Sequence, residues 1–379
     1  MERRSLLSVS TSTPAEASLD SNYAGGTLGI NVASNQSYRG TALWTDVRKQ
    51  LDAWSYSGGN STPLSGADVN AQGYPTGTSA SNGAYTATQM IGYPDGTYTL
   101  SYQGAGTIAV SGTGSIIAGS TQTSTVNGVT TTTALVSLKK DTGNQIVFTA
   151  NNFTTTSPLS NFHFMMPGYA VNTAQVFNPA AVARLKTFGL IRLMDLFDVN
   201  NSALTNWSDR PLPTAFTATT SNGISYEDAI TLANETNTDV WWNIPVNANN
   251  QFITNLANLI KYGSDANGNA YTSTQANPAN APLNSNLKVH IEFGNELFTP
   301  GTYATNTNDA AAQANPYLDS TLPNLDGQES LFRLRQIYDL FSSVYTTSLS
   351  SHIGFVWTGY FDSLSGSPGT LTTNAITYS

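Results

Sequence analysis

The sequence contains no cysteine and very few charged residues. Among its 379 residues are 15 Lys or Arg and 24 Asp or Glu, so only 10% are charged and the net charge is −9. The lack of cysteine excludes a disulfide framework and thiolate chemistry. The negative charge disfavours nucleic acid as a partner. No apolar run is long enough to cross a membrane, so we expect no membrane span.

The polar residues are mainly Asn, Thr, Ser and Gly, a composition that fits an exported bacterial protein. Residues 1–22 lack the apolar core of a secretory signal. They resemble the LEPR-XLL leader of exported and surface proteins at Glu2, Arg4, Leu6, Leu7 and Ser8. The resemblance implies an extracellular or cell-surface location in a bacterium. The alternative is a disordered tail.

Residues 92–166 predict a separate β-domain. Strand-like runs, "GTYTLSY", "GTIAV", "TTALVSL" and "NQIVFTA", follow one another at short spacing between Gly/Ser turns. This spacing is typical of an antiparallel β-sandwich. We therefore expect a sandwich-like domain inserted into a larger domain, which comprises residues 23–91 and 167–379.

Strands and helices alternate in the larger domain. Residues 27–32 predict a strand and residues 43–54 a helix. After the insert, strands are expected at 190–196, 240–246, 287–293 and 353–360, with helices between them. Alternation of this kind gives a parallel sheet with helical crossovers. The chain is thus expected to be α/β.

The stretch "LKVHIEFGNELF" indicates what kind of sheet this is. Val289, Ile291 and Phe293 share one face of the strand, and His290 and Glu292 share the other. An apolar face under helices and a polar face inside favour a (β/α)8 TIM-type barrel over an open sheet. The strand at 353–360 is only about the fifth, so we expect the barrel to be incomplete at the C-terminus.

Asn295 and Glu296 follow that strand, at the end where barrel enzymes have their active sites. The pair resembles the acid/base signature of clan A glycoside hydrolases. The runs "PLSGADVNAQGYPT", "FGLIRLMDLFDVNNSALTNWSDRP" and "WWNIPVNANN" also resemble a family of bacterial clan A glycoside hydrolases with a β-domain inserted early in the barrel. This chain departs from the family pattern at Phe298, where members tend to have Trp, and at Val246, where they tend to have His.

The resemblance implies a retaining hydrolase of β-linked polysaccharides, with Glu296 as acid/base and Asn295 placed for a sugar hydroxyl. Retaining enzymes need a second carboxylate about 5–5.5 Å away. Glu292 cannot supply it, because four residues of extended strand span roughly 13 Å. We expect Glu292 to support the site from below by pairing with Arg192, and Glu296 to lie in an open cleft. The nucleophile is expected to be missing, so this chain should hydrolyse glycans negligibly.

Four further residues are candidates for binding the substrate. Arg192 is expected to hold the site carboxylates; a structural ion pair with Asp195 or Asp198 is the alternative. Trp241 and Trp242 are neighbours on a strand, so one is expected to stack on sugar and the other to pack in the core. Trp207 is expected either to line a cleft or to anchor its loop.

No metal or cofactor is expected. His163, His290 and His352 are not spaced as metal ligands, and "DVNAQG" at 68–73 has too few acidic residues for a calcium loop. The expected partner is a polysaccharide or oligosaccharide, and the oligomeric state is left open. A noncatalytic carbohydrate-binding or surface-adhesion protein is the alternative function, and a β-rich structural adhesin is a third.

Overall fold

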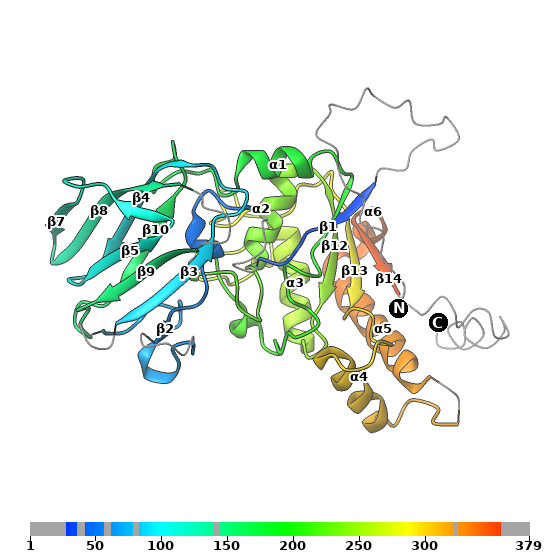
Figure 1. The fold of residues 1–379 in the computed structure, drawn as a ribbon. Helices are drawn as coiled ribbons and strands as arrows, with labels where there is room; N and C mark the ends of the chain where they lie inside the picture. The colour runs from blue at the N-terminus through cyan, green and yellow to red at the C-terminus, as the bar shows by residue number, and fades with distance from the viewer. Residues whose placement is uncertain are drawn as a thin grey trace, which may run out of the picture.

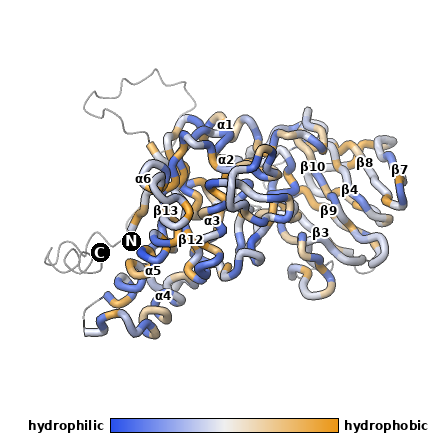
Figure 2. Tube along the Cα trace, turned by 180° about the vertical axis from the view of Figure 1, so that it is seen from behind, coloured by the Kyte–Doolittle hydropathy of each residue, from blue (hydrophilic) through white to orange (hydrophobic). Residues whose placement is uncertain are grey.

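The structure is a computed structural model that describes residues 28–35, 42–56, 62–78, 83–139, 145–321 and 324–357. The leader expected at 1–22 lies outside these residues. The described chain is a mixed α/β protein with two parts (Figure 1). A parallel sheet with its helices forms one part, and antiparallel strands form the other. Figure 2, the view from behind, shows the same two parts.

The parallel sheet has five strands whose order in space follows their order in the chain. They are β1 (Gly29–Asn31), β11 (Leu190–Arg192), β12 (Asp239–Ile244), β13 (Val289–Phe293) and β14 (Ile353–Val356). Every neighbouring pair is parallel. Among the described residues β1 and β14 each pair on one side only, so a closed barrel is not found.

Helices connect the parallel strands. They are α1 (Pro179–Leu185), α2 (Tyr226–Thr236), α3 (Asn250–Tyr262), α4 (Tyr303–Ala314), α5 (Leu325–Tyr345) and α6 (Leu349–His352). One of them, α4, packs on the neighbouring helix α5 (Figure 1). Local sequence sets the helix starts: the Asn178, Ser225 and Asn249 side chains each accept a hydrogen bond from a backbone N–H of the first turn. Gly263 ends α3 at a positive φ, as expected for a helix stop.

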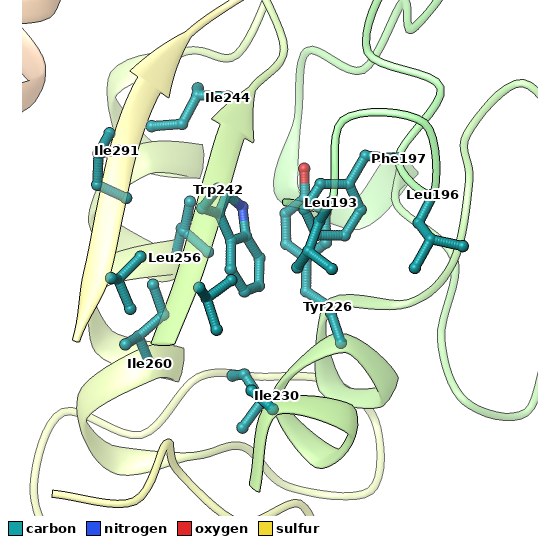
Figure 3. Packing of buried hydrophobic residues seen from close by; sticks show 14 of the residues in the cluster. Leu193, Leu196, Phe197, Tyr226, Ile230, Trp242, Ile244, Leu256, Ile260 and Ile291 are labelled. Atoms are coloured by element: carbon teal, nitrogen blue, oxygen red, sulfur yellow. The ribbon is translucent and has the colours of Figure 1, made fainter. Parts of the chain in front are cut away.

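The core beneath these helices confirms the expected alternation of faces. Figure 3 shows Trp242 and Ile291, from neighbouring strands, directed toward Leu256 and Ile260 of α3 and Tyr226 of α2. All five side chains are at most 2% exposed. Burial of such apolar side chains is the main source of stability for this part of the molecule.

The antiparallel strands form two sheets. One has the order β10 (Ser160–Met165), β4 (Gly96–Gln103), β8 (Val129–Leu138) and β6 (Gly114–Ile116), with β7 (Gln122–Val126) also paired to β8. The other has the order β2 (Ser55–Tyr56), β3 (Ala84–Gln89), β9 (Gln145–Asn151) and β5 (Thr107–Gly112). Buried side chains of both sheets belong to one core, which is the arrangement of a sandwich. Strands β2 and β3 precede residue 92, where the sequence analysis begins the β-domain.

The helix expected at 43–54 is wrong. Only a 3₁₀ turn, η1 (Val47–Gln50), forms there. The apolar residues that suggested one helical stripe belong to two different cores. Trp44 packs on Phe177 in the core of the parallel sheet, whereas Trp54 packs on Phe162 and Phe216 in the core of the sandwich.

A partly buried carboxylate, Asp46, links η1 to the sandwich. It accepts hydrogen bonds from Nε of Arg48 at 3.1 Å and from the backbone N–H of Phe164 at 3.0 Å, and it lies 2.8 Å from Nδ1 of His163. Burial by itself raises the pKa of the Asp46 carboxyl. The charge of Arg48 and the hydrogen bonds and charge of His163 outweigh that effect and hold the pKa well below its ordinary value.

We predict that Asp46 stabilises the fold at neutral pH and loses this effect in acid. Its pKa is lower in the folded state than the value of about 3.9 expected when unfolded. Its contribution is therefore complete above pH ~4 and is lost as the pH falls toward the folded-state pKa. Urea unfolding at several pH values should show a shallower acid dependence for Asp46→Asn than for the wild type. Asp339→Asn, at a carboxylate that is 59% exposed, is the control. An unchanged acid slope in Asp46→Asn contradicts the prediction.

Candidate active site

Polar side chains form rows across the face of the parallel sheet that the helices do not cover. The register aligns Asn31, Arg192, Trp241 and His290 on four neighbouring strands. Two residues further along β12 and β13, Asn243 is aligned with Glu292. The residues between them in sequence belong to the helix-side core. Alternation along the strands therefore brings these polar groups together on one face.

Glu292 is the centre of this polar face. Its Oε2 accepts hydrogen bonds from Nη2 of Arg192 at 2.8 Å, Nε1 of Trp241 at 2.8 Å and Nδ2 of Asn243 at 2.6 Å. The Glu292 side chain is only 1% exposed. A buried carboxylate is tolerated only when it is paired and hydrogen-bonded, and here three donors from two other strands meet that need. We call these four side chains the Glu292 network.

The expected hydrogen bond between Arg192 and Glu292 is thus confirmed. The alternative for Arg192 is not found, because among the described residues it pairs with neither Asp195 nor Asp198. Asp195 instead accepts a hydrogen bond from Nδ2 of Asn31 at 2.6 Å.

Burial raises the pKa of the Asp198 carboxyl. A hydrogen bond from the Asn201 side chain lowers this pKa, and the negative charge of Asp195 raises it further.

Arg192 extends the network to the end of β13. The same Nη2 atom donates to Oδ1 of Asn295 at 2.7 Å, and the guanidinium lies 4.8 Å from the centre of the Trp241 ring. Nδ2 of Asn295 in turn donates to Oδ1 of Asn200 at 3.1 Å. Asn295 is 2% exposed. Its amide, expected from the resemblance to face a sugar hydroxyl, is therefore held by protein groups on both sides.

Glu296 lies directly beyond this network and is exposed to solvent. Strand β13 ends at Phe293, and the chain then turns with φ of 66° at Gly294 and 45° at Glu296. The positive φ favours glycine at residue 294, where a Cβ would also lie 2.7 Å from the Leu297 side chain. Positive φ values are uncommon at residues other than glycine, and those that occur are concentrated at functional sites. The turn places Glu296 at the carboxyl end of β13, as expected.

The three tryptophans expected to bind substrate lie in different surroundings. Trp242 is 1% exposed in the helix-side core, so it is the structural member of its pair. Trp241 lies on the opposite face and is partly exposed. Trp207 is in the loop after β11, where its Nε1 donates to the backbone carbonyl of Gly268 at 2.9 Å. It also lines a cavity of about 830 Å³ whose lining includes none of Arg192, Trp241 and Glu296.

Three asparagines of the site were missed in the sequence. Asn243 is two residues from Trp241 on the same strand, and Asn31 follows Ile30, whose side chain packs against the helix-side core. Alternation along each strand therefore predicts that both asparagines lie on the polar face. Asn200 lies in the long loop after β11, where no periodic pattern marks it. Its contact with Asn295 depends on the path of that loop.

No metal site is seen in the part of the chain that the structure describes, since no three His, Asp or Glu side chains are grouped for coordination there. None of the described helices has the length and apolar character needed to cross a membrane.

We predict that Glu292→Gln destabilises the protein, because it removes the negative charge that pairs with the Arg192 guanidinium. Removing one partner of a buried ion pair costs about 3–5 kcal/mol. Glu296→Gln, the same substitution four residues later at an exposed side chain, should leave the free energy of unfolding nearly unchanged. Urea unfolding of both variants checks this. Equal stability of the two variants contradicts a supporting role for Glu292.

Comparison with known proteins adds no relative to these observations: no family model, no curated protein and no solved structure matches the chain. The resemblance to clan A glycoside hydrolases therefore rests on the residues themselves.

Proposed function

We propose that the protein is an exported glycoside hydrolase that acts on a β-linked polysaccharide by a retaining mechanism, with Glu296 as acid/base. The observation that carries the proposal is the hydrogen bonding of Arg192 to both Glu292 and Asn295. This contact fixes the residue before Glu296 and leaves the Glu296 carboxyl at the surface.

The sheet supports a site at this place. Parallel strands in chain order, joined by helices, are the arrangement of successive strands in a TIM-type barrel. We propose that the five strands are part of such a barrel. In barrels and in open α/β sheets alike, ligands bind at the carboxyl ends of the strands. Arg192, Asn243 and Asn295 lie at or beyond the carboxyl ends of three neighbouring strands.

The proposed chemistry gives each residue a separate role. Glu296 donates a proton to the leaving glycosidic oxygen and later takes one from the attacking water. Arg192 and Asn295 fix the end of β13 from which Glu296 extends, and Trp241 offers a partly exposed ring to the sugar on the same face. Glu292 holds these groups in place. We assign no nucleophile among the described residues.

Export is the part of this proposal that rests on sequence alone. The leader-like residues 1–22 and the low content of charged residues support an extracellular or cell-surface location. A polysaccharide, too large to enter a cell intact, is a substrate suited to that location.

A noncatalytic carbohydrate-binding protein is the second candidate. It is favoured by one observation: among the described residues, no side chain donates a hydrogen bond to the Glu296 carboxyl. A catalytic acid is normally oriented by such partners. In this alternative the polar face binds sugar and Glu296 performs no proton transfer.

External azide tests the catalytic proposal, because it can attack in place of a protein nucleophile and none is assigned among the described residues. Aryl β-glycosides of several sugars are incubated with the 379-residue chain, with and without azide, and the products are separated. We expect negligible hydrolysis without azide. With azide we expect attack at the anomeric carbon, departure of the phenol with a proton from Glu296, and a glycosyl azide of inverted configuration.

Leaving groups then isolate the role of Glu296. With a phenyl glycoside, which needs protonation, Glu296→Gln should lower the azide-dependent rate by about 10²–10⁴-fold. With a dinitrophenyl glycoside, which needs no protonation, the rate should be nearly unchanged. Robust hydrolysis without azide shows that a nucleophile was overlooked. No azide product from any glycoside favours the binding protein instead.

A further inference from the structure

A second candidate site lies between the sandwich and the loops of the parallel sheet. It is the cavity of about 830 Å³ that Trp207 lines. Part of its lining comes from described residues on either side of β2 and before β3, namely Ala53, Trp54, Leu64, Val69, Ala71, Gln72 and Gly73. Another part comes from residues 206–222, after β11, together with residues 267–269 after α3. The volume is within the range of ordinary ligand sites.

The walls of this cavity carry many neutral hydrogen-bonding groups. Its amide side chains include Gln72, Asn222, Asn267 and Asn269, and its hydroxyls include Thr214 and Thr220. Each amide offers two N–H donors and a carbonyl acceptor. The Gln72 and Asn267 side chains are exposed and make no hydrogen bond with another described residue. They are therefore available to a ligand.

The charged groups in the lining are already engaged. The Arg210 guanidinium donates to both carboxylate oxygens of Glu227, at 2.7 and 2.9 Å, and to the carbonyl of Gly268 at 2.7 Å. Asp209 accepts hydrogen bonds from the backbone and side chain of Asn206. Among the described residues, the lining has no other charged side chain. The described part of the cavity therefore offers no free cation to a phosphate or another anion.

Trp207 adds a rigid aromatic surface to the cavity. The Arg210 guanidinium lies 4.0 Å from the centre of its ring, and the ring also packs edge-on against Tyr226 and Phe252. With its Nε1 bonded to Gly268, the indole is fixed in position while remaining partly exposed. A fixed aromatic ring among amides and hydroxyls suits a ligand with apolar C–H faces and many hydroxyl groups.

We propose that this cavity is a binding site for a neutral carbohydrate chain, separate from the site at Glu296. This binding role goes beyond the proposed function and does not depend on hydrolysis. Net charge supports the choice of neutral over acidic glycans, since the protein carries −9 and the described residues of the lining add no free positive group.

Affinity electrophoresis tests the proposal. The protein is run through gels containing hydroxyethyl cellulose, arabinoxylan, galactomannan, laminarin or, as the anionic comparison, polygalacturonate. We expect retardation by at least one neutral polysaccharide and none by polygalacturonate. Ala71→Trp, at an exposed position of the lining, should fill the cavity and weaken binding about tenfold or more, equivalent to about 1.4 kcal/mol.

Matched controls separate this cavity from other surfaces. Ala118 and Gln122 are exposed residues of the sandwich that are not in the cavity lining. The variants Ala118→Trp and Gln122→Ala should therefore bind like the wild type. Gln72→Ala should weaken binding. The proposal is overturned if no neutral polysaccharide retards the protein, or if Ala71→Trp and Gln72→Ala bind normally.

Discussion

The buried carboxylate of Glu292 is the group on which the arrangement of the polar face depends. Removing a carboxylate from water is costly, and donors from β11 and β12 must converge on it to offset that cost. Arg192 and Trp241 are thereby held in one orientation. Arg192 in turn binds Asn295, so the end of β13 is fixed relative to its neighbouring strands. The Arg192 guanidinium, which donates to both Glu292 and Asn295, therefore determines the polar surroundings of Glu296.

The long loop after β11 joins this site to the rest of the molecule. Near its start, Asn200 contacts Asn295. Further on, the same loop carries Trp207 and Arg210 to the cavity beside the sandwich, and Arg48 donates to the backbone carbonyls of Ala215 and Phe216. The backbone of a single connection therefore links the carboxyl end of the sheet, the cavity and the sandwich core. A glycan chain held in the cavity would be held by a segment that also contacts the candidate active site.

Sequence periodicity predicted the parts of the fold whose contacts are local. The alternation of strand and helix after residue 167 and the two faces of β13 follow from residue spacing alone, whereas the pairing of Arg192 with Glu292, 100 residues apart, was expected from the family resemblance. The stripe at 43–54 misled, because spacing does not tell which of two cores a side chain enters. Strand β3 was missed because it pairs with β9, far along the chain, and its sequence alone has a weak strand pattern. The enclosure of Asn295 depends on a loop of irregular structure, which no period describes.

The hydrogen bond from Trp241 to Glu292 can be observed directly through the indole N–H resonances in a proton–nitrogen correlation spectrum. The chain has six tryptophans, and Trp241→Phe identifies the resonance of interest. A donor to a buried carboxylate is held in a short, charge-assisted hydrogen bond. We predict that this resonance is shifted downfield, and that Glu292→Gln moves it upfield while the Trp207 resonance stays in place. An unchanged Trp241 resonance in Glu292→Gln would contradict the central role given to Glu292.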